Sequence, residues 1–577
     1  MRARGNYIFW RREWLPQTSS SLVVLPTALA ATTMSANATF SEPWSGTLTH
    51  LEWPSTPRLA LITLINFPVL AILLNVLWQL LPRPKSQPPL VWHWIPFLGS
   101  AATYGRDPIG FFRQCREKYG NCFTFILLGK RVTVTLGTRG NDYVLGGKHT
   151  QLAAEDVYSP LTTPVFGKDV VYDCPNEKLM EQKRFVKVSL TIDKFRAYVG
   201  MIEDEIKGYL ETDPKFRVYQ MDDINEWGAF PVLEVFSEMT ILTASRTLQG
   251  REIRERLTKD YAQVYHDLDH GFTPLHWMIP NLPLPSYRKR DAAQAKMSAF
   301  YQSILRHRRE HPEEHQDDDV MASLMKQRYR DGTPLRDHEI AHILIALLMA
   351  GQHTSSSSLA WTMLHIADRQ DIQEALYEEQ VKHFGTPDGG LRDITYDELR
   401  DLKVLDAVVR ETLRLHPPIH SIMRMAHEDI PVPATLAAPS EDVTYVVPKG
   451  DIVMASPIVS QLDPTVWENA ETWEPLRWYD DKGVAAQAHK QYNEGEKIDF
   501  GFGLVSKGTV SPYLPFGAGR HRCIGEQFAY LQISTAICAL IRRLELKLEG
   551  NFPKSDYESM MVQPLPCKIL YRRRKFD

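Results

Sequence analysis

The sequence is poor in cysteine. Only six of its 577 residues are cysteines, and they are scattered at positions 115, 122, 174, 523, 538 and 567. No two of them form a CxxC pair, so neither a zinc framework nor a disulfide framework is expected, and the main body fits a reducing compartment. The chain also lacks an excess of basic residues, since 66 Lys and Arg stand against 70 Asp and Glu. The resulting net charge of −4 gives no electrostatic basis for binding nucleic acid.

Charge is absent from one segment near the N-terminus. The run from Leu59 to Leu81 has 23 residues without a charged side chain. As a helix it would be about 34 Å long, which spans a hydrocarbon core of about 30 Å. We therefore expect a transmembrane helix at 58–82, the alternative being a helix buried in the core. The proline-rich stretch 83–89 is expected to be a stiff, non-helical hinge, and Arg83 and Lys85 place it on the cytoplasmic side.

The residues before this helix, 1–57, are expected to form a leader and a lumenal segment. Asn37-Ala38-Thr39 is a glycosylation sequon, which agrees with a lumenal position. Within 1–33, four arginines precede the apolar run Leu22 to Ala31, a pattern typical of signal peptides. The alternative is that Met34 is the true start of the protein. The sequence leaves both open.

The body, 90–577, contains no repeat and no low-complexity tract, so one large domain is expected. Apolar residues at helical spacing predict helices at 228–248, 291–309, 338–369, 371–384, 396–415 and 525–545. Two β-hairpins are predicted, one at 122–136 with a turn at Gly129-Lys130 and one at 444–455 with a turn at 448–451. The charged stretch 308–319 is expected to be a solvated loop or a helix end. The fold class is therefore mainly α with small β-sheets.

The strongest local signal is the segment Phe516-Gly517-Ala518-Gly519-Arg520-His521-Arg522-Cys523-Ile524-Gly525. An isolated Cys is more often a small buried apolar residue than a ligand. Here the glycines allow tight turns and a close approach to a flat cofactor. The helix that follows and the neighbouring basic residues would stabilise a thiolate at Cys523. This FxxGxHxCxG pattern is similar to the haem-binding loop of the cytochrome P-450 superfamily, in which the cysteine is the axial ligand of the iron.

Two further segments resemble the same superfamily. Glu411-Thr412-Leu413-Arg414 matches its ExxR motif, whose Glu and Arg share one face of a helix. Trp473-Glu474-Pro475-Leu476-Arg477-Trp478 resembles the segment that supplies the third partner, Arg477. The resemblance implies that Glu411, Arg414 and Arg477 form a structural triad that braces the haem loop. The superfamily more often has Phe where this chain has Trp478, which is a departure.

The predicted helix 338–369 carries the next signal. Ile343 to Ala350 is apolar all round, so the helix is expected to be buried, and Gly351-Gln352-His353-Thr354-Ser355 follows. The Thr354 hydroxyl can bond to the carbonyl of Ala350 and bend the helix, opening a groove for dioxygen and water. The plainer alternative is a packed helix with small residues. Most members of the superfamily have an acid where this chain has His353, and GQHTS resembles one branch, the fungal sterol 14α-demethylases.

Longer segments resemble that branch too, from about residue 85 to the end of the chain. They are 158–167 with 171–176 and 181–183, 267–274, and 413–424. By position, the resemblance implies that haem propionates are held by Tyr158, Tyr172, Lys183, Arg424 and His521. It implies a mostly apolar sterol wall formed by Phe166, Val171, Tyr172, Phe272, Ala350, Thr354, Ile419, Ser421, Met423 and Met560. Each of these could instead be an ordinary core or surface residue. Tyr172 is expected to serve both groups.

The resemblance also implies a reaction. The 14α-methyl group of lanosterol or 24-methylenedihydrolanosterol would be removed in three oxygenations through an alcohol and an aldehyde, with release of formate, in ergosterol biosynthesis. The cofactor would be haem b with Cys523 as thiolate ligand, and O2 and NADPH-derived electrons would be co-substrates. The expected partner is an NADPH-cytochrome P-450 reductase, the expected location is the endoplasmic reticulum membrane with the body in the cytoplasm, and azoles would bind the iron. The alternatives are another sterol- or xenobiotic-oxidising monooxygenase, or a non-catalytic haem- or sterol-binding protein.

A charged pair is expected to carry protons in the site. This chain has no acid beside Thr354, and His353 is the natural substitute because its ordinary pKa, about 6.5, is near physiological pH. A buried imidazolium needs a counter-charge. Asp269 is the candidate, since the segment around it resembles the substrate-channel helix of the branch. The alternative is that His353 is a core histidine and Asp269 a helix-end residue.

Overall fold

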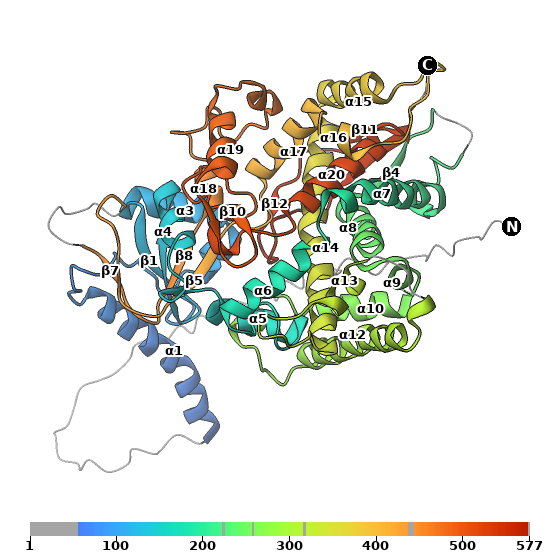
Figure 1. Ribbon diagram of the computed structural model, residues 1–577. Coiled ribbons are helices and arrows are strands. Elements are labelled where there is room, and N and C mark those ends of the chain that lie inside the picture. Colours follow the sequence, from blue (N-terminus) through green and yellow to red (C-terminus); the bar gives the residue numbers. More distant parts are fainter. Residues whose placement is uncertain (1–55, 222–224, 257–258, 315–318, 437–443, 575–577) are drawn as a thin grey trace, which may run out of the picture. The chain divides into compact units, whose positions relative to one another are not determined.

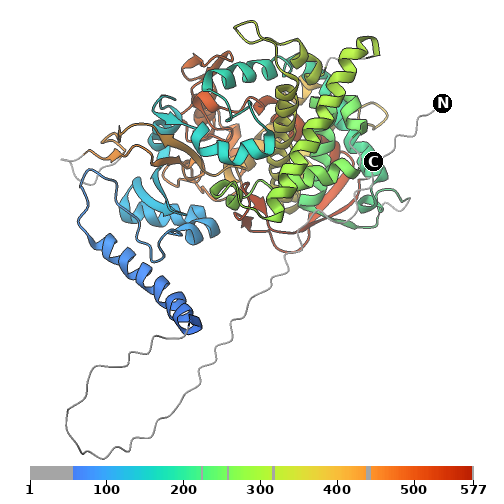
Figure 2. The ribbon, with the colours of Figure 1, turned by 90° about the horizontal axis from the view of Figure 1, so that it is seen from below.

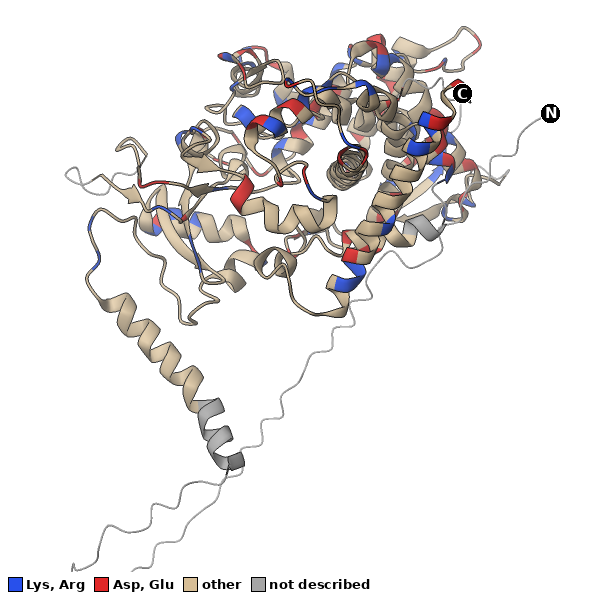
Figure 3. Ribbon diagram, turned by 60° about the horizontal axis from the view of Figure 1, so that its bottom comes forward, with Lys and Arg blue, Asp and Glu red and all other residues tan. Residues whose placement is uncertain are grey.

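The computed structural model describes residues 56–574 except 222–224, 257–258, 315–318 and 437–443. The expected leader, with Asn37 and Met34, lies outside the described residues. The first helix, α1, runs over Thr56–Leu80, so it starts just before the uncharged segment and contains nearly all of it; the part of α1 that is not grey in Figure 3 is tan throughout. Within the described residues, no helix combines the length and apolar character needed to cross a membrane. The span at 58–82 and its orientation therefore stay predictions.

The chain divides into two compact units, of which the larger contains 82–93 and 97–577 and the smaller contains α1. In the larger unit helices predominate and the sheets are small (Figure 1), which confirms the predicted fold class. Its helices are α2 Ala101–Arg106, α3 Pro108–Tyr119, α4 Gly137–Leu145, α5 Glu155–Phe166, α6 Asn176–Lys187, α7 Ile192–Thr212, α8 Val232–Ala244, α9 Arg251–Arg256, α10 Lys259–Asp269, α11 Pro274–Met278, α12 Pro285–Glu310, α13 Val320–Lys326, α14 Asp337–Asp368, α15 Gln370–Phe384, α16 Tyr396–Leu399, α17 Lys403–Leu415, α18 Pro457–Gln461, α19 Val484–Glu494 and α20 Glu526–Ile541.

The largest sheet has five strands in the order β1-β2-β8-β5-β3. Strands β2 and β8 are parallel, and the other neighbours are antiparallel. A second sheet has the order β11-β14-β4, and three further pairs are β6-β7, β9-β10 and β12-β13. The strands are β1 Cys122–Leu127, β2 Lys130–Thr135, β3 Leu152–Ala153, β4 Gly228–Pro231, β5 Ile422–Ala426, β6 Ile430–Pro431, β7 Val446–Val447, β8 Ile452–Ala455, β9 Lys497–Asp499, β10 Leu504–Ser506, β11 Leu544–Leu548, β12 Ser555–Asp556, β13 Gln563–Pro564 and β14 Lys568–Arg573.

Helix α14 is the axis of the larger unit. It packs against α8, α12, α17 and α20, which come from distant parts of the chain. Helices α10 and α12 lie side by side in both Figure 1 and Figure 2, next to the N-terminal half of α14. Most α14 side chains are buried, as its apolar sequence predicts, but Ala350 is exposed in the middle of the helix. Open space therefore lies beside this turn.

The structure corrects three sequence predictions. The hairpin at 122–136 is confirmed, but 444–455 is not a hairpin, because β7 pairs with β6 while β8 has β2 and β5 on its two edges. The helix predicted at 228–248 begins at Val232, because 228–231 form β4 and pair with β14. The helix predicted at 396–415 is divided into α16 and α17.

Candidate functional site

The loop around Cys523 holds its thiol in an open position. All six cysteines are described, and Cys523 is the only exposed one. The loop is closed by the Cys523 N–H, which donates to the Phe516 carbonyl oxygen at 3.1 Å. Gly517 and Gly519 have φ of 66° and 64°, and a Cβ on Gly519 would lie 2.4 Å from the Leu145 carbonyl oxygen. These two glycines are therefore required by the backbone, as the sequence predicts.

Burial and nearby polar groups have opposite effects on the pKa of the Cys523 thiol. Surrounding protein atoms raise the pKa of the thiol by burial, although its surface stays accessible, as at the floor of a hollow. The Gly525 N–H and the charges of Lys183 and Arg522 act in the opposite direction but do not outweigh burial. The helix N–H and the basic neighbours thus favour the thiolate, as the sequence predicts, while burial keeps the pKa of the thiol above its usual value. A coordinated metal cation deprotonates such a thiol outright.

Basic and phenolic side chains gather near this thiol without a matching acid. Burial, followed by the charges of Arg424 and Arg520, lowers the pKa of Lys183 to about 8, against an opposing effect of Cys523. Burial and the charges of Arg424, Lys183 and Arg520 hold the pKa of His521 well below its usual value. In the part of the chain that the structure describes, none of these four basic side chains makes an ion pair. Such a cluster of mutually repelling basic groups fits a ligand that carries two carboxylates, as haem does.

The two predicted tyrosines complete this cluster. Tyr158 stacks on Tyr172 with ring centroids 5.3 Å apart, and the Tyr172 ring is 6.0 Å from the ring of His521. The Tyr158 hydroxyl accepts the Met423 N–H at 3.0 Å, so its own hydrogen stays available to donate. The structure therefore brings together all five residues that the sequence assigned to the propionates.

The predicted hydroxyl contact in α14 is present. The Thr354 hydroxyl donates to the Ala350 carbonyl oxygen at 2.8 Å, which confirms that bond. Ser358 donates in the same manner to the Thr354 carbonyl oxygen at 2.9 Å. Thr354 thus lies one turn from the exposed Ala350, facing the same open space.

His353 and Asp269 meet across two helices. The His353 Nε2 lies 2.7 Å from an Asp269 carboxylate oxygen. Burial raises the pKa of Asp269, but the charge and hydrogen bond of His353 outweigh it, so the pKa lies below its usual value. The predicted pair is therefore present in α10 and α14, and its role in carrying protons stays a prediction.

Sequence reasoning missed a third residue at this pair. Tyr265 is one turn before Asp269 on α10 and is fully buried. Its hydroxyl donates to the Gln352 side-chain oxygen at 2.8 Å and lies 3.4 Å from the His353 Nε2. The four-residue spacing from Asp269 was the available signal, because residues at i and i+4 share a face of a helix.

Some residues of the predicted sterol wall contact one another and others do not. Phe166 stacks on Phe272 with centroids 5.8 Å apart, and Phe272, Met423 and Met560 pack along the edge of one apolar cluster. Ile419 is 48% exposed, while the Ser421 hydroxyl is 2.8 Å from the His420 Nδ1. Val171 has a φ of 55°, which is unusual for a β-branched residue.

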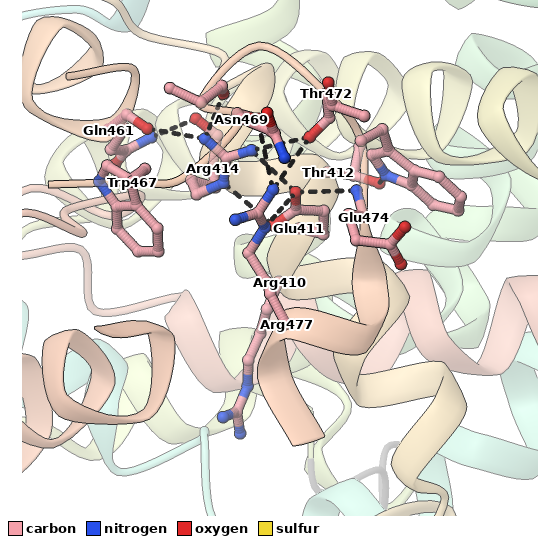
Figure 4. Close-up of polar contacts among 12 residues, drawn as sticks. Arg410, Glu411, Thr412, Arg414, Gln461, Trp467, Asn469, Thr472, Glu474 and Arg477 are labelled. Atoms are coloured by element: carbon pink, nitrogen blue, oxygen red, sulfur yellow. Dashed lines mark hydrogen bonds and ion pairs between the residues drawn. The ribbon is translucent and has the colours of Figure 1, made fainter. Parts of the chain in front are cut away.

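The ExxR triad is a closed, buried network (Figure 4). Both Arg414 and Arg477 contact Glu411, at 2.8 and 2.9 Å. Arg414 also donates to the carbonyl oxygens of Gln461, Ala470 and Thr472. The departure at Trp478 proves to be part of the network, because its indole N–H donates to Glu411 Oε2 at 2.9 Å.

Comparison with known proteins agrees with this geometry. The family model described as Cytochrome P450 matches residues 88–571. The chain is 50% identical to a lanosterol 14-alpha demethylase of Mycosarcoma maydis over 90% of this chain and 93% of the relative. It is 47% identical to a sterol 14-alpha demethylase of Aspergillus flavus over 88% of this chain and 94% of that relative.

A solved structure shares the fold. A retinoic acid-bound cyanobacterial CYP120A1 is 20% identical and superposes with a TM-score of 0.68, covering 85% of this chain and all of that one. The long matches, the exposed cysteine and the buried triad lead to one conclusion. The chain belongs to the cytochrome P450 family and, within it, to the sterol 14-alpha demethylases.

Proposed function

We propose that this chain removes the 14α-methyl group of lanosterol or 24-methylenedihydrolanosterol in three successive oxidations and releases formate. The observation that carries the proposal is the accessible Cys523 thiol beside four basic side chains, Lys183, Arg424, Arg520 and His521, which make no ion pair among the described residues. Haem b, once bound, supplies the oxygen-activating chemistry with O2 and NADPH-derived electrons. Cys523 would hold its iron, and Tyr158, Tyr172, Lys183, Arg424 and His521 its carboxylates.

The remaining residues have distinct tasks in this proposal. His353 would hold a proton at Nε2 against the Asp269 carboxylate. The Thr354 hydroxyl gives its hydrogen to the Ala350 carbonyl, so its oxygen would accept a hydrogen bond from a water in the groove. Phe166, Val171, Tyr172, Phe272, Ala350, Ile419, Ser421, Met423 and Met560 would orient a rigid sterol and exclude water from it. Glu411, Arg414 and Arg477, which contact one another, would brace the haem loop without touching the substrate.

The direct test is turnover with purified components. The haem-loaded protein is incubated with an NADPH-cytochrome P-450 reductase, NADPH and each sterol, and products are identified by mass spectrometry. The 14-demethylated sterol and formate are expected, and Cys523→Ala should lose both along with the red-shifted Soret band of the ferrous carbon monoxide complex. Oxidation at another position would favour a different sterol or xenobiotic monooxygenase. Binding without any turnover would favour a non-catalytic haem protein.

We also propose a location in the endoplasmic reticulum membrane, with a single span at 58–82 and the body in the cytoplasm. Supporting this, α1 has no charged residue after Arg58 and exposes large apolar side chains, including Leu70, Leu77 and Leu80. Arg83 and Lys85 follow directly. Protease added to sealed microsomes should digest the body, whereas full protection would reverse the proposed orientation.

A further inference from the structure

The segment 167–174 connects α5 to α6 in a strained backbone conformation. It carries Val171 and Tyr172, both in the proposed site. Asp169 and Val171 have φ of 68° and 55°. Positive φ is uncommon for residues other than glycine, and for a β-branched residue it is a genuine outlier. Such conformations persist only where the surroundings hold them in place.

One buried side chain bonds to the backbone of this segment at both strained positions. Gln182, on α6, is 3% exposed. Its amide nitrogen donates to the Asp169 carbonyl oxygen at 2.9 Å, and its side-chain oxygen accepts the Val171 N–H at 3.3 Å. The same oxygen lies 3.9 Å from the Cys174 sulfur.

Gln182 is itself tied to the start of α14. Its amide nitrogen also donates to the Tyr329 hydroxyl at 3.2 Å, and that hydroxyl donates to Glu339 at 3.2 Å. The amide therefore cannot turn over without breaking contacts on both sides. Other contacts hold the outer part of the segment, since the Asp173 carboxylate accepts the Asp169 N–H at 2.8 Å and His338 contacts Asp169 at 2.9 Å. The Cys174 thiol contacts the Val171 carbonyl oxygen at 3.4 Å, but among the side chains that the structure describes only Gln182 accepts the Val171 N–H.

We propose that Gln182 is a positioning residue for the site, which holds the strained segment 167–174 so that the Tyr172 ring stays stacked on Tyr158. Gln182 itself touches neither substrate nor cofactor in this proposal. The inference rests on the proposed function, because Tyr172 and Val171 enter through it. Without the Gln182 bonds, Val171 would relax toward negative φ, and the direction of the chain into Tyr172 would change.

The test uses the full-length, haem-loaded protein with Gln182→Met, which keeps the volume and removes both bonds. Gln373→Met is the matched control, because Gln373 is 2% exposed and bonds to the N–H and C=O of Leu546, an ordinary strand residue. Hydrogen exchange of 167–174 and spectral titration with an azole are measured, with thermal unfolding alongside. Gln182→Met should lose exchange protection in 167–174 and bind the azole about tenfold more weakly with an intact thiolate spectrum. Gln373→Met should lower thermal stability alone.

A second variant separates positioning from packing. Glycine adopts positive φ without strain, so in a Val171→Gly background Gln182→Met should lose less azole affinity than it does alone. Three results would each overturn the proposal. They are unchanged hydrogen exchange and azole affinity in Gln182→Met, equal effects of Gln182→Met and Gln373→Met, and losses of azole affinity that are strictly additive for Gln182→Met and Val171→Gly. If Gln182→Met fails to load haem, Gln182→Glu replaces it in the test. The carboxylate keeps an acceptor for the Val171 N–H and loses the bond to the Asp169 carbonyl oxygen. Measuring hydrogen exchange needs no turnover. If the wild-type chain does not demethylate sterols, the proposed function is wrong, but the exchange measurement still tests the role of Gln182.

Discussion

At the scale of single residues, the pair formed by Asp269 and His353 is the sharpest point to probe. Asp269→Asn keeps the shape of the side chain and removes its charge. If the carboxylate carries protons, turnover should fall at least tenfold while NADPH consumption continues without product. Haem spectrum and sterol binding should stay near wild type. The measurement is the ratio of product formed to NADPH consumed.

The control for this variant lies two residues away on α10. Asp267→Asn makes the same change at a carboxylate that contacts Gln263 and His266 on its own helix instead of His353. It should leave coupling unchanged. Wild-type coupling in Asp269→Asn would show that protons enter by another route.

Trp478 offers a second test at this scale. Its indole donates to the fully buried carboxylate of Glu411. A hydrogen bond to a buried charge contributes about 1.5–3 kcal/mol, so Trp478→Phe should lower the free energy of unfolding by about that amount. Trp467→Phe removes an indole that donates to the Ser460 carbonyl oxygen at 3.0 Å, a neutral acceptor. The two losses in free energy of unfolding are compared by chemical denaturation. If Trp467→Phe lowers this free energy more than Trp478→Phe does, the explanation of Trp478 by a bond to a buried charge is wrong.

Residue identities in the site could be predicted from sequence because motifs fix spacing as well as chemistry. Cys523 and Glu411 with Arg414 come from contiguous segments, and the structure gives each the expected surroundings. The network role of Trp478 was not predictable, because it depends on a contact between residues 67 positions apart. Gln182 was visible in the sequence, but nothing local showed that it bonds to a strained backbone.

At the scale of elements, continuous apolar sequence predicted the long helices closely. The predicted helix 338–369 is α14, Asp337–Asp368, and 371–384 is α15, Gln370–Phe384. The break between α16 and α17 could not be seen locally. Glu379 on α15 accepts the N–H groups of Val404 and Leu405 at 2.8 and 3.1 Å and so caps α17 from another helix. Strand β4 was likewise missed because its partner β14 is distant in sequence.

The contact between α14 and the end of α17 makes stability depend on pH. The Nε2 atoms of His365 and His416 are 3.0 Å apart, and the His416 ring stacks on Trp361 at 3.9 Å. Burial, then the charge of Arg414, lowers the pKa of His416 to about 3, and burial with the charges of His416 and Arg369 holds that of His365 well below its usual value. In the unfolded chain both titrate near about 6.5.

The sign follows from proton binding. Between about pH 6.5 and 3 the unfolded state binds more protons at these two residues than the folded state does. Their contribution to stability is therefore present above about pH 6.5 and is lost progressively as the pH falls. His416→Gln keeps a hydrogen-bonding group and does not titrate. Between pH 7.5 and 5.5 the denaturation midpoint of this variant should fall less than that of wild type. An equal fall in both would show that His365 and His416 do not contribute to the pH dependence of stability.

At the scale of the whole molecule, the boundary between the two units can be located by truncation. Residues 82–93 belong to the larger unit although they precede its first helix. Their backbone is bonded into two sheets: the Val446 N–H donates to the Ser86 carbonyl oxygen at 2.7 Å, the Thr124 N–H to that of Pro89 at 2.8 Å, and the Val91 N–H to that of Thr124 at 2.8 Å. The proline-rich stretch predicted as a hinge is therefore attached to the body along its length.

We expect a chain that begins at Pro82 to load haem and unfold at nearly the temperature of the full-length protein. A chain that begins at Phe97 lacks all three backbone bonds and leaves polar groups of the buried residue Thr124 without partners. At about 1 kcal/mol for each bond, and more for each unpaired buried group, it should lose about 3 kcal/mol or more. Thermal unfolding followed through the carbon monoxide spectrum compares the two, with the chain that begins at Pro82 serving as the control for the loss of α1. Equal unfolding temperatures would show that 82–96 add nothing to the body, and instability of both would mean that α1 stabilises the catalytic fold directly.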